Sequence, residues 1–199
     1  MAAVTILETK GLTKEYAGIK ANTDIDFSLQ TGKVTALIGP NGAGKSTFVG
    51  MVSGRIEPTR GQVVFDGRDI SKLPAHKRIQ LGIAYTFQIT SIFPRLSVHE
   101  NLSIAARRLY AGKPAALTAK IDTILSKVAL TERADQIAGD LSYGHQRLLE
   151  IGMGLVQDPR VFILDEPTQG LTEAEVNDFI ALIRTLAGDT TVLLIEHDM

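Results

Sequence analysis

The segment GPNGAGKST, residues 39–47, restricts the fold more than any other part of the sequence. It fits the pattern G-x-x-x-x-G-K-[ST] and stands between the apolar run Val34–Ile38, an expected strand, and the helical run Lys45–Val52. Its glycines let the backbone curl so that successive N–H groups converge on phosphate oxygens, and the following helix adds its positive N-terminal end. A chain of this length contains the pattern by chance on the order of once in a hundred sequences. The segment therefore predicts a site for nucleotide phosphates.

Within this phosphate-binding loop (P-loop, residues 39–47), single residues have distinct expected roles. We expect Lys45 to reach the β- and γ-phosphates of a nucleotide, and the Ser46 hydroxyl to ligate Mg²⁺. The residues expected to contact the nucleotide are Gly39, Asn41, Gly42, Ala43, Gly44, Lys45, Ser46 and Thr47. The competing interpretation is a glycine-rich turn that happens to contain a lysine, and the strand–helix setting argues against it.

A second motif, VFILDEPT, places an acidic pair at the end of a buried strand. Val161–Leu164 is a continuous apolar run of the parallel-strand type, and Asp165 and Glu166 follow it. In an open parallel sheet, ligands bind beyond the carboxyl ends of the strands, where the P-loop also lies. We therefore expect Asp165 to hold Mg²⁺, directly or through water, and Glu166 to orient or deprotonate the attacking water. Without the P-loop, a solvated acidic pair at a helix N-terminus would be the better interpretation.

Composition and charge limit the remaining possibilities. The chain has 199 residues, of which 44% are hydrophobic and 22% charged, enough for one large domain or a core with an inserted subdomain. A formal net charge of −1 argues against a generally basic nucleic-acid binder. The lack of cysteine excludes disulfides and cysteine-based zinc sites. The N-terminus lacks signal-peptide features, and the apolar runs are far shorter than the roughly 20 residues that cross a bilayer.

The order of periodic runs predicts an α/β fold with a helical insertion. Strands are expected at 4–9, 25–29, 34–38, 62–65, 83–87, 161–164 and 192–195. Helical periodicity dominates the middle of the chain, with capping-box patterns at Ser97 and Thr172, a helix at Gln146–Leu155 and a loop at residues 111–118. We therefore expect a nucleotide-binding core at about residues 1–88 and 156–199, and a helical segment at about 89–155. The return to strand, helix and strand indicates a parallel sheet.

The stretch LSYGHQRLLEIG, residues 141–152, admits two functional interpretations. Ser142 and His145 stand three residues apart, at helical spacing, and could form a nucleophile with its base. A nucleophile elbow, however, requires glycine two residues before the serine, and Asp140 occupies that position. The alternatives are that Ser142 binds an anion at a helix N-terminus, or that it only caps the helix.

Taken together, the motifs resemble the ATP-binding subunit of ABC transporters. Their order is GPNGAGKST, TFQ, LSYGHQ, ILDEPT and IEHD, which covers essentially the whole chain. The resemblance implies a P-loop NTPase core with a parallel sheet, an N-terminal antiparallel β subdomain and an inserted α-helical subdomain. It also implies that ATP lies between the P-loop of one subunit and the signature segment of another. In this chain the signature segment is LSYGHQ, residues 141–146.

The resemblance assigns roles to residues that mean little alone. Ser142 and Gly144 would contact the γ-phosphate of the partner subunit's ATP. Gln88 would contact Mg²⁺ and the attacking water, and His197 would contact the γ-phosphate as the switch histidine. Tyr16 would stack on adenine. The expected catalytic set is Glu166, His197, Gln88 and Lys45, and the expected Mg²⁺ ligands are Ser46, Gln88 and Asp165.

The sequence departs from the family pattern at several positions. Tyr143 and His145 replace the glycine and glutamine of the commonest signature, and Thr172 stands where an aspartate is usual. Gly152 and Gly154 interrupt the signature helix, at about 1 kcal/mol each relative to alanine. Because family members continue beyond the IEHDM segment with a helix and strands, we expect the C-terminus to be truncated.

The tyrosine form of the signature, with FDGRDI, LGIAYTFQ and IFPRLSVHENL, resembles ATPase subunits of branched-chain amino acid importers and their urea or amide relatives. The expected function is ATP hydrolysis that powers import from the cytoplasmic face of the membrane. Expected partners are transmembrane permease subunits, a second identical or paralogous ATP-binding subunit and, indirectly, an external solute-binding protein. No nucleic acid is expected. Alternatives are a soluble ABC-type ATPase acting on nucleic acid or ribosomes, an ABC ATPase for another substrate, and a nucleotide-binding module without hydrolysis.

Overall fold

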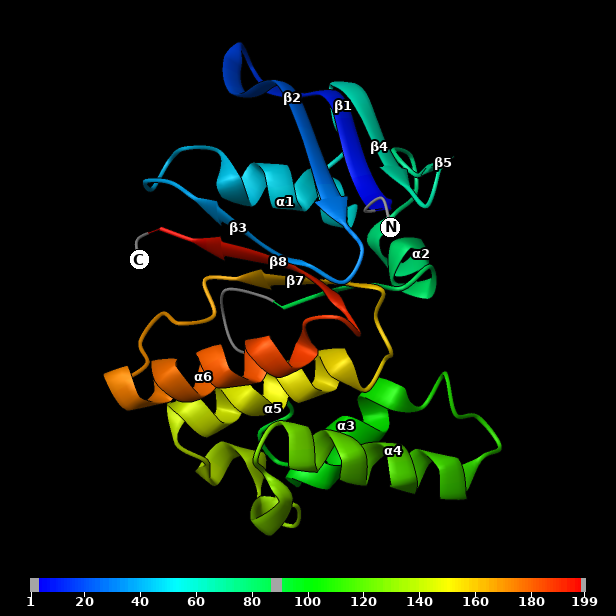
Figure 1. The fold of residues 1–199 in the computed structure, drawn as a ribbon, viewed down its shortest axis with the longest axis vertical. Helices are drawn as coiled ribbons and strands as arrows, with labels where there is room; N and C mark the ends of the chain where they lie inside the picture. The colour runs from blue at the N-terminus through cyan, green and yellow to red at the C-terminus, as the bar shows by residue number, and fades with distance from the viewer. Residues whose placement is uncertain (1–3, 87–90, 198–199) are drawn as a thin grey trace. The chain divides into compact units, whose positions relative to one another are not determined.

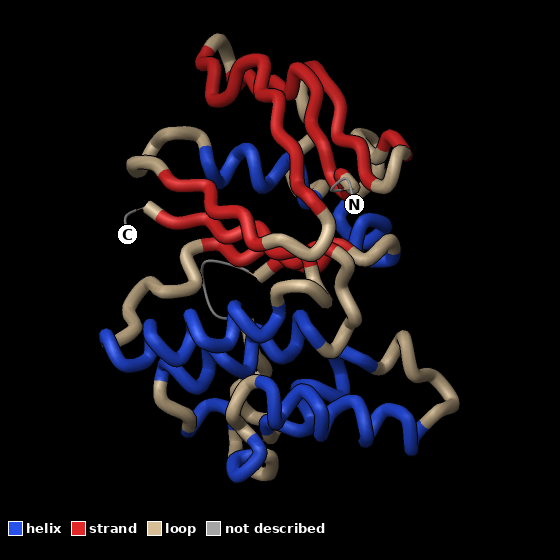
Figure 2. Tube along the Cα trace, in the orientation of Figure 1, coloured by secondary structure: helices blue, strands red, loops and turns tan. Residues whose placement is uncertain are grey.

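The computed structural model describes residues 4–86 and 91–197, and the chain divides into two compact units. The α/β unit contains residues up to 85, residues 160–166 and residues from 186 onward. The helical unit contains residues 86–159 and 167–185. Figure 1 follows the chain by residue number, and Figure 2 shows that the strands belong to the first unit and most helices to the second.

The N-terminal part of the α/β unit is an antiparallel sheet with the strand order β2-β1-β4-β5. Its strands are β1 (Thr5–Tyr16), β2 (Ile19–Gln30), β4 (Arg60–Phe65) and β5 (Arg68–Asp69). The first two are much longer than their apolar runs predicted. A two-residue turn at Ala17 and Gly18, both with positive φ, joins them, and this kind of turn matches the strand twist and lets pairing continue to Tyr16 and Ile19.

The second sheet of this unit is parallel, as expected, with the order β3-β8-β7-β6. Its strands are β3 (Val34–Ile38), β6 (Ile83–Tyr85), β7 (Val161–Asp165) and β8 (Thr191–Glu196). Helix α1 (Lys45–Ser53) lies between the two sheets, and α2 (Ala75–Gln80) leads into β6 (Figure 1). Every residue of β7 is buried, which is why its sequence is continuously apolar up to Asp165.

The helical unit is built on α3 (Val98–Ala106), α4 (Pro114–Lys127), α5 (Tyr143–Leu155) and α6 (Glu173–Leu186), with short 3₁₀ turns at Thr131–Arg133 and Ala138–Asp140. Both predicted capping boxes are present, at Ser97 with Glu100 and at Thr172 with Glu175. The loop expected at residues 111–118 was wrong, because α4 already begins at Pro114, and proline suits the first turn of a helix. Helix α5 also begins three residues earlier than expected.

Gly152 has a packing role in this unit. A Cβ atom at this position would lie 3.2 Å from Leu102 of α3 and 3.3 Å from Ile124 of α4. The glycine therefore lets α5 approach both neighbouring helices closely. The close packing of the three helices therefore explains why α5 has glycine at position 152, although glycine weakens a helix.

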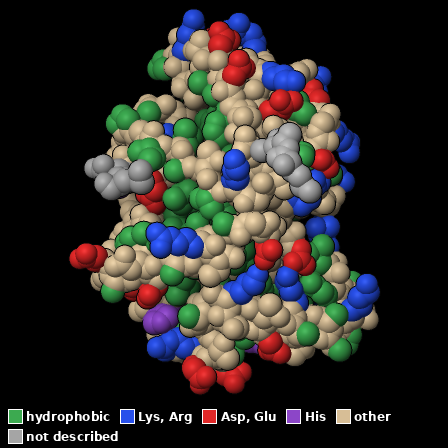
Figure 3. All heavy atoms as spheres, viewed as in Figure 1, with side chains coloured by type: hydrophobic (Ala, Val, Ile, Leu, Met, Phe, Trp, Pro, Cys, Tyr) green, Lys and Arg blue, Asp and Glu red, His purple; other side chains and the backbone are tan. Residues whose placement is uncertain are grey.

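Among the described residues, none of the helices has both the length and the apolar character needed to cross a bilayer. On the face drawn in Figure 3, Lys and Arg side chains are interspersed with Asp and Glu side chains. This mixed pattern agrees with the formal net charge of −1.

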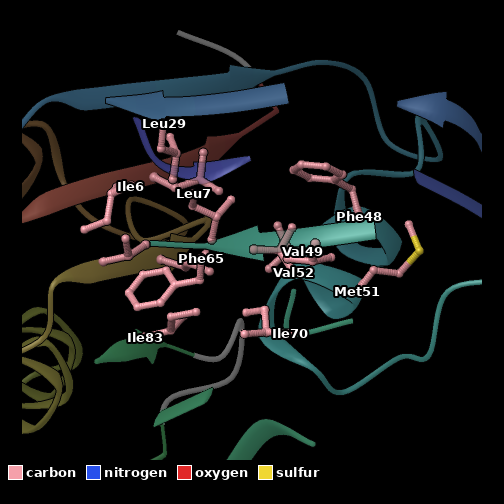
Figure 4. Packing of buried hydrophobic residues seen from close by; sticks show 14 of the residues in the cluster. Ile6, Leu7, Leu29, Phe48, Val49, Met51, Val52, Phe65, Ile70 and Ile83 are labelled. Atoms are coloured by element: carbon pink, nitrogen blue, oxygen red, sulfur yellow. The ribbon is translucent and has the colours of Figure 1, made fainter. Parts of the chain in front are cut away.

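Side chains of α1 pack into the core of the α/β unit (Figure 4). Phe48, Val49 and Val52 of α1 pack with residues from both sheets, and the rings of Phe27 and Phe48 meet edge to face at 5.3 Å. Burial of each such side chain contributes about 1.5–3 kcal/mol. The helix that follows the P-loop is therefore held by a large apolar cluster, which also includes Ile6, Leu7, Leu29, Phe65, Ile70 and Ile83.

A buried arginine holds the C-terminal end of α1. Arg78 of α2 is 1% exposed, and its guanidinium donates to the carbonyls of Met51 and Val52, both at 2.7 Å. It also donates to the carbonyls of Ser71 and Leu73. Burial lowers the pKa of Arg78 to about 10, so it remains a cation at neutral pH. Carbonyls at a helix C-terminus carry partial negative charge, which this cation offsets.

Candidate functional site

The P-loop connects β3 to α1 in a conformation that requires glycine. Gly42 and Gly44 have φ values of 82° and 85°, in the left-handed region. A Cβ atom on Gly44 would lie 2.5 Å from the Ala21 carbonyl oxygen. Gly44 is the N-cap residue of α1 and offers no capping side chain, and the first turn of the helix holds no acidic residue. The N–H groups at this helix end are therefore suited to an anion.

The P-loop lysine lies within the curve of the loop. Lys45 is 8% exposed, and its ammonium donates to the carbonyl oxygens of Gly39 and of Pro40, the latter at 3.0 Å. These carbonyls hold the cation beside the loop amides. Ser46, the next residue, is exposed on the first turn of α1.

The strand register brings the predicted motifs to one edge of the parallel sheet. Ile195 of β8 is level with Leu37 of β3 on one side and with Asp165 of β7 on the other. The P-loop therefore begins just beyond the level of Asp165. The Gly39 N–H donates to the Glu196 carbonyl at 3.4 Å, which places His197, an exposed residue, beside the start of the P-loop.

Asp165 is almost completely buried, with 4% of its surface exposed. Its Oδ2 accepts a hydrogen bond from the Tyr85 hydroxyl at 2.7 Å. Burial, followed by the hydrogen bond to Asp165, raises the pKa of Tyr85 well above its ordinary value. The phenol therefore stays protonated and acts as the donor. Tyr85 was not predicted from the sequence, although it is the aromatic residue that ends β6, next to β7 in the sheet.

The backbone is strained at the second residue of the acidic pair. Glu166 has a φ of 45°, which is unfavourable for a residue with a side chain, and its N–H donates to the Ile195 carbonyl at 2.9 Å. Strain of this kind persists where the surrounding structure enforces it, and it is frequent at functional sites. The side chain of Glu166 is half-buried at the sheet edge.

Of two further predicted residues, Tyr16 and Gln88, the structure describes only Tyr16. Tyr16 ends β1 with 44% of its surface exposed, and the Lys14 ammonium lies 5.0 Å from its ring centroid. An exposed ring can stack on a base. Gln88 lies outside the described residues, so its predicted role has no structural counterpart here.

The signature segment belongs to the helical unit. Ser142 is the N-cap residue of α5, and its Oγ lies 2.7 Å from Nδ1 of His145. Gly144 is buried, and a Cβ atom there would meet the carboxylate of Glu175 at 2.1 Å. Hydrogen bonds from Thr172 hold the pKa of Glu175 below its usual value. Ser142 therefore caps α5. Its contact with a phosphate stays a prediction.

The fold and the α/β site together define a class of protein. A glycine-rich loop runs from a parallel strand into a helix, and an Asp-Glu pair ends a nearby strand at the same sheet edge. This arrangement is that of a P-loop nucleotide-binding protein.

Comparison with known proteins identifies the family. The sequence pattern described as "ABC transporter" matches residues 22–169. The chain is 39% identical to the high-affinity branched-chain amino acid transport ATP-binding protein BraF of Pseudomonas aeruginosa, over 98% of this chain and 82% of BraF. It is 34% identical to the corresponding LivG protein of Salmonella typhimurium, with the same coverage.

A solved structure agrees with this assignment. The ADP conformation of MJ1267, an ATP-binding cassette of an ABC transporter, matches with a TM-score of 0.87 and 30% identity, over 98% of this chain and 82% of that one. The chain belongs to the ABC transporter family and is an ATP-binding cassette ATPase.

Proposed function

We propose that this chain is the ATP-hydrolysing subunit of an importer for branched-chain amino acids or related small solutes. The observation that carries the proposal is the 39% identity to BraF over nearly the whole chain, combined with a P-loop and an acidic pair at one sheet edge. The sequence resemblance to this importer group points in the same direction.

The α/β unit has the groups needed to hold Mg²⁺ with ATP. Ser46 and Asp165 offer a hydroxyl and a carboxylate, the hard oxygen donors that Mg²⁺ prefers. Within residues 4–86 and 91–197, no group of three or more His, Cys, Asp or Glu side chains forms a metal site of its own. That fits an ion held by few protein ligands together with nucleotide phosphates. When bound, the ion would neutralise phosphate charge, and Gln88 is the third proposed ligand.

Catalysis in this proposal rests mainly on positioning and charge. Lys45 and the amides of the P-loop hold the phosphates, and Tyr16 stacks on the adenine. Glu166 orients the attacking water and accepts its proton, and the proposed role of Gln88 is to contact the same water. His197, which follows β8 beside the start of the P-loop, has the proposed role of contacting the γ-phosphate. The strained backbone of Glu166 supports a functional role for this residue.

The signature segment completes the site of a second subunit. In the proposed dimer, Ser142 and the N–H of Gly144 contact the ATP held by the partner's P-loop, at the N-terminal end of α5. The partner is a second copy or a paralogue, and a symmetric pair forms two such sites. His145, which lies against Ser142, takes the place of the usual glutamine in this contact.

Membrane attachment would use the loop before α3. Phe93 is 47% exposed, and the side chain of the fully buried Asn101 holds its backbone by accepting from its N–H at 2.8 Å and donating to its carbonyl at 3.1 Å. A fixed loop that presents an aromatic ring is suited to a protein partner. We propose that permease subunits dock here, at the cytoplasmic face of the membrane, with a solute-binding protein on the other side.

Affinity purification from gently solubilised native membranes tests the proposal. Mass spectrometry should find multi-span membrane proteins in stoichiometric amounts, and Phe93→Asp should remove them while the chain stays folded. Ile104→Asp, which changes an exposed apolar residue of α3, is the matched control. Recovery of ribosomes or nucleic acid in place of membrane proteins would support the soluble ABC ATPase and refute import.

A further inference from the structure

Tyr85 makes a hydrogen bond to Asp165 that has no part in the proposed binding and hydrolysis of ATP. Its hydroxyl donates to Oδ2 of Asp165 at 2.7 Å, from the end of the neighbouring strand β6. Asp165 is 4% exposed, so its carboxylate has little access to bulk water. A donor that meets a buried carboxylate stabilises its ionised form and restricts its rotation.

Tyr85 is held both by a cation against its ring and by its place in the parallel sheet. The Arg55 guanidinium lies 3.9 Å from the ring centroid, and Arg55 Nε donates to Ser53 Oγ at 3.0 Å. Ser53 is the last residue of α1, the helix that begins in the P-loop. The backbone of Tyr85 is paired with Ile163 of β7 in the parallel sheet. The phenol thus bridges the end of the P-loop helix and the strand that carries Asp165.

We propose that Tyr85 is a positioning residue that orients the Asp165 carboxylate for the nucleotide-bound divalent cation. The inference rests on the proposed function, since it takes Asp165 as a ligand of that cation. A hydrogen bond on Oδ2 sets the rotation of the carboxylate and directs its remaining lone pairs. Groups that orient a metal ligand in this way typically change metal affinity about 10- to 100-fold when they are removed.

Tyr85→Phe removes the hydroxyl and keeps the ring beneath Arg55. With ADP bound, Mn²⁺ affinity measured by electron paramagnetic resonance should fall about tenfold. ADP affinity in EDTA should remain at the wild-type value, because the P-loop contacts do not involve Tyr85. A loss of Mn²⁺ affinity without a loss of ADP affinity would distinguish a role in positioning the ion from general damage to the fold. Equal losses in both affinities, or an unchanged Mn²⁺ affinity, would overturn the inference.

The helical unit offers a matched control. Tyr110 also donates its hydroxyl to a carboxylate, Oδ2 of Asp158, at 3.1 Å, but Asp158 is exposed. Tyr110→Phe makes the same chemical change far along the sequence from the P-loop, and Mn²⁺ affinity should not change. A loss equal to that of Tyr85→Phe would show that the effect is unspecific and would count against the proposal.

A second measurement uses the wild-type chain and covers the case in which Tyr85→Phe folds poorly. The chain has four tyrosines, and phenylalanine variants of Tyr16, Tyr110 and Tyr143 assign three ¹³Cζ resonances, which leaves Tyr85 as the fourth. Addition of Mg²⁺ to the ADP-bound chain should shift the Tyr85 resonance. No shift, under conditions where the ion binds, would refute the positioning role.

The two proposals fail in different ways. If wild-type protein with ADP binds no Mn²⁺, or if Asp165→Ala leaves the Mn²⁺ affinity unchanged, the proposed metal role of Asp165 is wrong and this inference falls with it. If Asp165→Ala weakens Mn²⁺ binding and Tyr85→Phe does not, the proposed function stands and only the role of Tyr85 is refuted.

Discussion

Glu166 combines a strained backbone with a side chain at the sheet edge, and it is the residue on which hydrolysis should depend most. We predict that Glu166→Gln retains ATP affinity, because the amide keeps the shape and leaves the P-loop intact. The ATPase rate should fall about 100-fold or more, because glutamine cannot accept a proton from water. Phosphate release and nucleotide binding measure the two quantities. Glu173→Gln, on the exposed first turn of α6, is the control, and near-normal turnover in Glu166→Gln would remove Glu166 from its role.

Arg78 acts on stability rather than on chemistry. Arg78→Met would remove the guanidinium donor from four carbonyl oxygens, two of them at the end of α1. We predict a loss of roughly 3 kcal/mol in the free energy of unfolding, measured by urea denaturation. Lys77→Met, one residue earlier and exposed, should change it little. An equal effect of both changes would contradict the role of Arg78 in holding α1.

At this scale, short motifs were predictable and long-range contacts were not. The P-loop and the Asp165-Glu166 pair were found because a few adjacent residues carry each signal. Tyr85 and Arg78 were missed, because their partners lie in segments that only folding brings near. No local pattern marks an aromatic residue as the donor to an aspartate on another strand.

Among the elements, the contact of α5 with α3 and α4 depends on the space that Gly152 leaves. Gly152→Leu would push a side chain into Leu102 and Ile124, so we predict a loss of about 2 kcal/mol in stability from overpacking. Gly152→Ala should lose much less stability. Its single added carbon requires the neighbouring side chains to move by only tenths of an ångström, and alanine favours the helix. Thermal unfolding of both variants checks this order. A leucine variant as stable as the alanine variant would show that the helices can separate freely.

Hydrophobic periodicity predicted the secondary structure correctly where one face of an element is buried. The parallel strands β7 and β8 were located nearly in full, and the capping boxes located the starts of the helices α3 and α6. The length of the β1–β2 hairpin was underestimated, because its outer half has little apolar signal and depends on the turn at Ala17 and Gly18. The order β3-β8-β7-β6 could not be predicted, since pairing between distant segments has no local signature. The boundaries expected near residues 88 and 155 remain a prediction.

For the whole molecule, the proposed site needs two subunits, which makes association depend on ATP. We predict that Glu166→Gln is monomeric in EDTA and dimeric with Mg²⁺ and ATP, as measured by light scattering after size-exclusion chromatography. Adding Ser142→Glu should abolish the dimer, because a carboxylate would face the partner's γ-phosphate. Thr123→Glu, an exposed change in α4, should not. A dimer that forms equally well without nucleotide, or that still forms with Ser142→Glu, would count against the shared site.

The position of β8 has a consequence for how the protein is made. This strand follows β3 and β7 in the sequence, yet it lies between them in the sheet. On the ribosome, the P-loop strand therefore emerges long before the strand that joins it to Asp165. Until Glu196 has left the exit tunnel, the apolar β7 has no partner on one side, and such strands are prone to aggregate. Nucleotide that binds the closed sheet can stabilise the fold only after that moment. We therefore expect the nascent chain to be most prone to aggregation before β8 emerges.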